Sequence, residues 1–256
     1  MGNCCRTYNS QSEEPEIQKF ENTGINENIF LDFSNYIFDK KYIREDELNK
    51  IKFTKEGLTD FIESLRRREY VQKFQDETIK ISILDDSILT SDFMLIRCEA
   101  QIPKEKFSPL TKSLSDLTNA IFNKEKRLKW DNNMKEIEIL KNINPQTQIV
   151  KTVTNKVLMV SSREMIEKRY EWNDNNVYYN FASSIPDDIY PPLEDPVRVL
   201  SYISINILWE DESNFYFDSI NQYDIKINIP QAMMLLSFPM KMKDFINKLV
   251  EFVKNE

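Results

Sequence analysis

Two alternating segments, separated by a pair of prolines, place the strongest constraint on how this chain can fold. Larger, mostly apolar residues occupy every second position over 177–185, and the same period returns over 197–209. A period of two residues is typical of strands that bury one face. Pro191 and Pro192 lie between the two segments, and neither can donate a hydrogen bond to a sheet ladder. The sequence therefore predicts a meander of long strands with one rigid excursion.

Similar patterns predict further strands and helices on both sides of this meander. Strands are expected at about 78–85, 92–102, 136–143, 147–153, 176–185, 197–209 and 214–229. A first helix is indicated by the spacing of Leu58, Phe61, Ile62 and Leu65. A second, over about 113–129, opens with Ser113 and Asp116 at the spacing of a capping box.

The last predicted helix is long and amphipathic. It begins at Pro230, whose fixed φ suits a first helical position, and Pro239 is expected to kink it. A continuous apolar stripe along it consists of Met242, Phe245, Ile246, Leu249, Phe252 and Val253. This stripe predicts that the helix packs on the sheet.

Composition excludes several classes of function. The chain of 256 residues contains no histidine, which excludes a Ser-His-Asp triad, a Cys-His pair and histidine-ligated metal sites. Its 3 glycines cannot build a phosphate-cradling loop. A net charge of −8 argues against nucleic acid as a partner, and no apolar run approaches the ~18 residues of a spanning helix. We therefore expect no enzyme activity, no cofactor and no metal.

The amino terminus reads Met-Gly-Asn-Cys-Cys. Once Met1 is removed, Gly2 could carry a myristoyl chain, with Cys4 and Cys5 as palmitoyl acceptors. A stable anchor needs two acyl chains or one chain with a basic patch, and acidic residues outnumber basic ones over 1–50. Residues 1–50 are expected to form a flexible, acylated tail and 51–256 a folded domain; the alternative is a disordered tail with two unmodified thiols.

An ordered set of short motifs runs through the second half of the chain. It comprises Lys129-Trp130-Asp131, Arg163-Glu164-Met165, Arg169, Tyr190-Pro191-Pro192, Val197-Arg198 and the run from Gln222 to Pro230. In this order and spacing the set resembles the StAR-related lipid-transfer (START) family, with Glu164 where the family usually has Asp. The resemblance implies an α+β helix-grip fold, in which a curved antiparallel β-sheet is closed over a lipid cavity by a long C-terminal α-helix.

The resemblance also implies one bound lipid, such as a sterol, a phospholipid or a ceramide, and it points to candidate site residues. Arg169 matches an arginine that lies near the polar end of the lipid in some members; the alternative is an ion pair with a strand neighbour. Candidate wall residues, with plain core packing as the alternative, are Met94, Ile96, Cys98, Tyr223, Ile225, Ile227, Met233, Leu236 and Met240. Cys98 is expected to be buried and unreactive.

The headgroup preference depends on whether Arg169 has an acidic partner. In sterol-binding relatives that partner comes from the preceding strand, and residues 144–163 contain no Asp or Glu. An unpaired buried arginine would be costly, and a lipid phosphate could neutralise it. This argument slightly favours a phospholipid over a sterol.

Three functions follow, in decreasing order of support. The first is a lipid-binding or lipid-transfer protein tethered by its acyl chains to the cytoplasmic face of a membrane. The second is an acylated adaptor whose domain binds a protein partner and whose cavity is filled by its own side chains. The third is an enzyme that uses carboxylates converging in the cavity.

Overall fold

The computed structural model describes residues 55–84, 93–156, 160–185, 187, 189–227 and 231–256, all of which belong to one compact unit. Within them the fold is α+β, with helices on both faces of one large, curved sheet. The candidate acylation residues Gly2, Cys4 and Cys5 lie outside the described residues, as does the predicted tail over 1–50.

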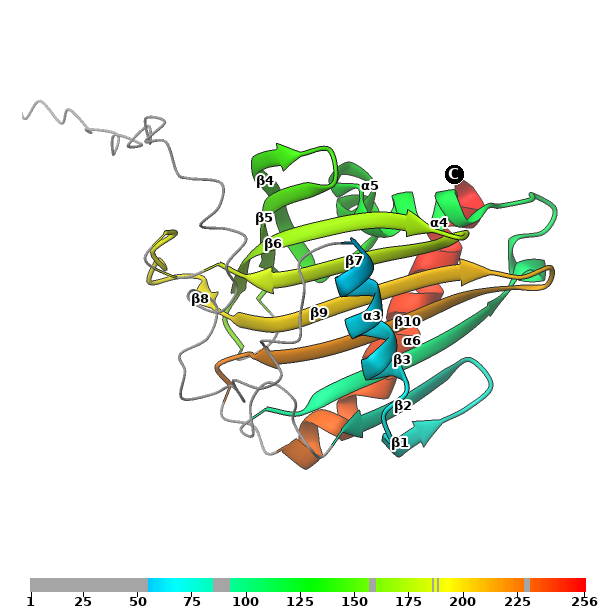
Figure 1. The fold of residues 1–256 in the computed structure, drawn as a ribbon, viewed down its shortest axis with the longest axis horizontal. Helices are drawn as coiled ribbons and strands as arrows, with labels where there is room; N and C mark the ends of the chain where they lie inside the picture. Colours follow the sequence, from blue (N-terminus) through cyan, green and yellow to red (C-terminus); the bar gives the residue numbers. More distant parts are fainter. Residues whose placement is uncertain (1–54, 85–92, 157–159, 186, 188, 228–230) are drawn as a thin grey trace, which may run out of the picture. The chain divides into compact units, whose positions relative to one another are not determined.

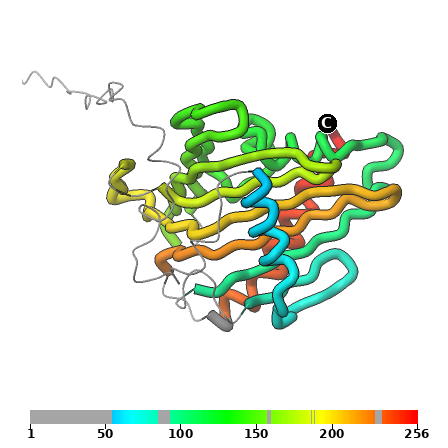
Figure 2. Tube along the Cα trace, in the orientation of Figure 1, coloured from blue at the N-terminus to red at the C-terminus, as the bar shows by residue number. Residues whose placement is uncertain are grey.

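The sheet follows the order β1-β2-β3-β10-β9-β7-β6-β5-β4, and each neighbouring pair along it is antiparallel. The strands are β1 (Val71–Gln75), β2 (Ile79–Leu84), β3 (Leu95–Pro103), β4 (Met134–Asn144), β5 (Thr147–Thr154), β6 (Arg163–Asp174), β7 (Val177–Ser184), β9 (Leu200–Glu210) and β10 (Asn214–Asp224). A short β8 (Val197–Arg198) pairs in parallel with β6. Figure 2 shows the strands side by side in this order.

One helix covers one face of the sheet. α3 (Lys55–Arg66) buries the predicted stripe of Leu58, Phe61, Ile62 and Leu65 against the sheet. The strands contribute alternate residues to this core, including Ile203, Ile205 and Ile207 of β9. Figure 1 shows α3 crossing the middle strands on this face.

The opposite face carries the remaining helices, α4 (Leu114–Phe122), α5 (Lys124–Trp130) and α6 (Gln231–Asn255) (Figure 1). The predicted stripe of α6 is confirmed, because Ile246, Leu249 and Val253 are buried in a second core. Lys243 of α6 also pairs with Asp76, in the turn between β1 and β2, and holds the pKa of that carboxyl at about 2. None of the described helices is long and apolar enough to cross a bilayer.

The elements differ from the sequence-based prediction in several places. β1 was not predicted, and the last predicted strand, expected over 214–229, ends at Asp224. β6 was not predicted as a strand, because charged residues such as Glu164, Glu167 and Arg169 obscure its alternation. The predicted helix over 113–129 is divided in two at Asn123, which adopts an extended conformation and accepts a hydrogen bond from the Lys126 amide. Asparagine stabilises a helix N-terminus better than a helix interior, so a second helix begins there. The capping box of Ser113 and Asp116 is present as predicted.

Candidate lipid-binding cavity

A cavity of about 260 Å³ lies on the α6 face of the sheet. The sheet supplies its floor through β5, β6, β7, β9 and β10, while β4, α4, α5 and α6 supply the remaining walls. Its lining includes Phe122, Met134, Ile137, Met242 and Phe245 on these walls. The volume lies just below the ~300–1,000 Å³ typical of small-molecule sites.

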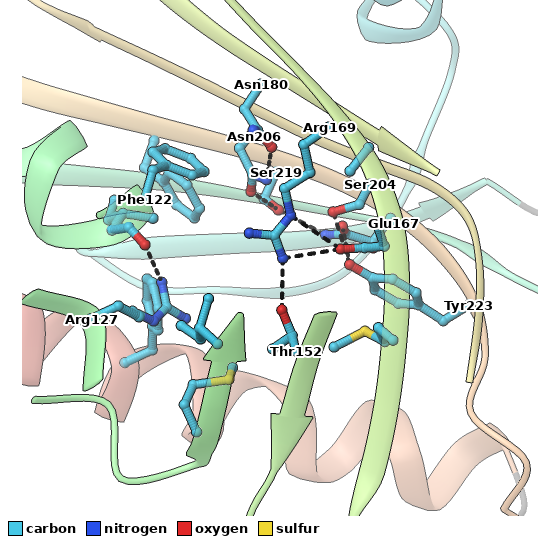
Figure 3. A pocket seen from close by; sticks show the side chains of 18 of the residues that line it. Phe122, Arg127, Thr152, Glu167, Arg169, Asn180, Ser204, Asn206, Ser219 and Tyr223 are labelled. Carbon is cyan, nitrogen blue, oxygen red and sulfur yellow. Dashed lines mark hydrogen bonds and ion pairs between the residues drawn. The ribbon is translucent and has the colours of Figure 1, made fainter. Parts of the chain in front are cut away.

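An ion pair lies at one side of the cavity. Arg169 and Glu167 point into it from β6, two residues apart and therefore on the same face of the strand. Arg169 Nη2 lies 3.1 Å from Glu167 Oε2 and donates to Thr152 Oγ1 of β5 at 2.9 Å (Figure 3). Both charges are thus partnered, which offsets much of the cost of burying them.

The floor of the cavity carries several polar side chains beside the apolar Met165, Ala182 and Phe217. β7 contributes Asn180, β9 contributes Ser204 and Asn206, and β10 contributes Ser219, Asn221 and Tyr223. Burial raises the pKa of the Tyr223 phenol well above its usual range, so this group stays protonated and can donate. Of these six residues only Tyr223 was predicted from the sequence, although Asn180, Ser204 and Asn206 alternate with apolar residues along their strands.

A second arginine lines the cavity near Phe122 (Figure 3). Arg127 forms an ion pair with Asp131, with a shortest separation of 2.6 Å, and its guanidinium lies 4.8 Å from the ring centroids of both Trp130 and Phe245. Burial lowers the pKa of Arg127, and the Asp131 carboxylate opposes that shift. This arrangement ties α5 to α6 through a cation packed against two aromatic rings that also contact each other.

The structure brings only some of the predicted site residues together. Arg169 and Tyr223 line the cavity. Met94 and Ile96 pack in the core on the same face of the sheet, and Ile225 lies just after the end of β10, where its carbonyl accepts from Arg163 Nε at 3.0 Å. None of these three residues lines the cavity, whose sheet residues come from β4, β5, β6, β7, β9 and β10.

The prediction that Met233, Leu236 and Met240 form the cavity wall is wrong. Their exposed fractions are 61%, 81% and 71%, whereas Met242 and Phe245 face the cavity. The first turns of α6 are apolar on more than one side, so the sequence pattern did not fix which side faces the sheet.

The premise of the phospholipid preference is also wrong, because Arg169 does have an acidic partner. The partner is Glu167 on the same strand, outside the 144–163 window that was searched for one. The predicted alternative for Arg169, an ion pair with a strand neighbour, is therefore present inside the cavity itself. The prediction for Cys98 is confirmed: it is buried, and burial raises the pKa of its thiol to about 12.

Comparison with known proteins places the chain in a family. Residues 96–256 match the START domain model, which covers more than half of the chain. The protein therefore belongs to the START domain family, whose domains bind and transfer lipids. No curated protein matches the chain in sequence.

Solved structures show the same fold at low sequence identity. Human StAR-related lipid transfer protein 5 superposes with a TM-score of 0.66 at 17% identity, covering 78% of this chain and 94% of that protein. Human STARD10 gives 0.61 at 17% identity, with coverage of 78% and 79%. A STAR-related lipid transfer protein from Xanthomonas axonopodis gives 0.52 at 15% identity, with coverage of 73% and 99%. The helix-grip fold is thus confirmed.

Proposed function

We propose that this protein binds and transfers one lipid, held in the cavity beneath α6 with its polar end against Arg169, Glu167 and Thr152. The observation that carries the proposal is the cavity itself, which combines apolar walls with a few polar groups fixed by ion pairing and hydrogen bonding. Burial of hydrocarbon, at roughly 0.8 kcal/mol per methylene, would drive uptake without covalent chemistry.

Two observations favour lipid binding over the other functions considered. An adaptor with a non-functional cavity would fill its interior with its own side chains, whereas this interior retains about 260 Å³. An enzyme of the kind considered would bring carboxylates together, whereas Glu167 is the only carboxylate among the described residues that line the cavity, and it is paired with Arg169.

We expect the protein to act at the cytoplasmic face of a membrane, held there by acyl chains on Gly2, Cys4 and Cys5. The composition and exposure of the first turns of α6 support the proposal that the protein contacts a membrane. Residues 231–240 carry no charged side chain, and three large apolar side chains in this segment are exposed: Met233, Leu236 and Met240. We propose that this stripe inserts among lipid headgroups, so that the helix covering the cavity meets the bilayer from which the lipid comes.

Lipid binding is tested by native mass spectrometry of the 256-residue chain after expression in lipid-containing cells. We expect one lipid per chain, and loss of that lipid in the double variant Glu167→Gln/Arg169→Leu. The double variant is preferable because Arg169→Leu alone would leave the Glu167 carboxylate buried and unpaired. Lys151→Leu, which removes a partly exposed cation of β5 away from the cavity, is the matched control and should keep the lipid. A folded wild-type chain that carries no lipid and ignores added phospholipid, sterol and ceramide would refute the proposal.

The membrane stripe is tested by Leu236→Asp/Met240→Asp. Both side chains are exposed, so we expect the melting temperature and lipid stoichiometry of the variant to match those of the wild type. Transfer between vesicles should fall roughly tenfold or more, because charged side chains do not insert at a bilayer. Glu251→Lys, on the exposed surface further along α6, is the control. An unchanged transfer rate in the double variant would show that the stripe does not contact the bilayer.

A further inference from the structure

One row of side chains is buried on the sheet face that carries α3, although α3 does not lie over it. The row consists of Ile149 of β5, Lys168 of β6 and Ser183 of β7, which pair directly across the three strands. Glu167 and Arg169, on either side of Lys168, point into the cavity, so the row points to the opposite face. Ile149 is 0% exposed and Ser183 is 1% exposed.

The described elements on this face contact β6 too far along the strand to bury the row. Trp172 Nε1 donates to Thr59 Oγ1 of α3 at 3.2 Å, and Glu164 pairs with Arg198 beside the proline-rich excursion. Each contact lies four residues from Lys168 along β6, which is about 13 Å of strand. A helix with its side chains reaches only about 5–6 Å from its axis. Figure 1 shows α3 over β7, β9 and β10, whereas β5 lies to one side of it.

The lysine of this row is also withdrawn from water. Lys168 is half-buried, and burial lowers the pKa of its ammonium group. A sheet that buries both faces needs a packed layer on each of them, whereas an open face leaves its side chains in water. The row therefore has the burial of a surface that lies beneath a further layer.

The chain that enters α3 can reach the row. α3 begins at Lys55, whose Nζ lies 2.8 Å from Asp174 Oδ1 at the end of β6. Asp174 and Lys168 are six residues apart on β6, or about 20 Å. An extended chain covers that distance in about six residues, so residues 33–48 come within reach of the row.

Residues 33–48 also have the composition of a segment that packs on a protein surface. A spacer that stays in water is poor in large apolar and aromatic residues. This segment contains Phe33, Tyr36, Ile37, Phe38, Tyr42, Ile43 and Leu48. Its acidic run, Glu45 to Glu47, is complementary in charge to a surface that carries Lys168.

We propose that residues 33–48 dock over Ile149 and its neighbours, so that the chain itself supplies the further layer on this face of the sheet. The predicted tail over 1–50 is then divided, and only the part before residue 33 links the candidate acylation sites to the domain. The membrane anchor would be attached on the sheet face away from the cavity. This inference goes beyond the proposed function and does not depend on what the cavity binds.

Cross-linking of the 256-residue chain tests the contact directly. With a short amine-reactive cross-linker and a mixture of isotope-labelled and unlabelled chains, we expect Lys40 or Lys41 to be joined to Lys141 or Lys168 within one chain. Lys141 is the β4 residue opposite Ile149. Lys248 of α6, on the other face of the sheet, is the control and should not be joined to Lys40 or Lys41. The absence of the expected cross-links, or their presence only between chains, where a second copy covers the row, overturns the proposal.

An introduced thiol then measures whether this segment covers the row. In Ile149→Cys we expect slow alkylation of the new thiol by iodoacetamide, followed by peptide mapping. Adding Phe33→Asp/Ile37→Asp should accelerate the reaction about tenfold or more, because a covered thiol reacts only when its cover opens. Phe20→Asp/Ile25→Asp makes the same two exchanges outside the segment and should leave the rate unchanged.

Cys98 reports on the fold in the same experiment, because it is 1% exposed in the core on the α6 face. Fast alkylation in Ile149→Cys alone overturns the proposal, as does slow alkylation that persists when Phe33→Asp/Ile37→Asp is added. If Cys98 becomes reactive, that variant has unfolded and the cross-links in the wild-type chain decide the question. Lipid stoichiometry should be the same in all these variants, so failure of this proposal leaves the proposed function intact.

Discussion

Arg198→Met is expected to lower the free energy of unfolding by about 3–5 kcal/mol, because it leaves a carboxylate buried without its partner. Arg198 and Glu164 have side-chain exposures of 7% and 3%, and Arg198 Nε and Nη2 lie 3.0 Å and 2.8 Å from the same oxygen of Glu164. Arg198 Nη1 also donates to Asp187 and to the Tyr190 carbonyl, both at 2.9 Å. One side chain thus holds β8, β6 and the proline-rich excursion together.

The loss is measured by urea unfolding at neutral pH, and a decrease of about 6–20 °C in melting temperature should accompany it for a domain of this size. Lys248→Met removes an exposed i,i+4 pair with Asp244 and should cost less than about 1 kcal/mol. The double variant Glu164→Gln/Arg198→Met should lose less than the single variant, because no buried charge is stranded. If the free energy of unfolding of Arg198→Met lies within about 1 kcal/mol of the wild-type value, the buried Arg198–Glu164 pair does not stabilise the fold.

The sequence predicted those parts of the fold in which one face of an element is clearly apolar. Ile203, Ile205 and Ile207 identified β9, and Leu58, Phe61 and Ile62 identified α3, because burial of hydrocarbon dominates both. β6 was not predicted, because it does not show one clearly apolar face. Its cavity-facing residues include Glu167 and Arg169, so neither face appears apolar in the sequence.

The candidate site was harder to predict than the fold, because its residues are polar and hydrophobic periodicity does not mark polar residues as buried. Where one face of a strand is apolar, the polar face is ordinarily assigned to solvent, and Ser204 and Asn206 on β9 fit that description. Here the polar face lines a cavity beneath α6 instead, and only the position of α6 on that face reveals this. Arg169 and Tyr223 were found through the family resemblance and not through periodicity.

Asp218→Asn is expected to have a comparably large effect on stability, at the end of α3, on the face of the sheet away from the cavity. The Asp218 side chain is 0% exposed and accepts from Arg66 Nε at 2.9 Å and from Arg97 Nε and Nη2 at 2.9 Å and 2.7 Å. Arg97 Nη1 donates in turn to the Arg66 carbonyl at 3.0 Å, at the end of α3. Loss of the carboxylate charge would leave two partly buried guanidinium groups facing each other, so we expect a loss of about 3–5 kcal/mol.

The Asp218→Asn prediction can also be checked by limited proteolysis, because loss of the Asp218 contacts should free the end of α3 from the sheet. Arg67 follows α3 and is exposed, so trypsin can cut there once the end of the helix detaches from the sheet. Cleavage after residues 66–68 should therefore be faster in Asp218→Asn than in the wild type. Glu63→Gln removes the more exposed partner of the same Arg66, and it should change stability by less than about 1 kcal/mol without accelerating cleavage. Equal cleavage rates in wild type and Asp218→Asn would mean that hydrophobic packing alone holds α3, since its buried stripe would then suffice without the charge cluster.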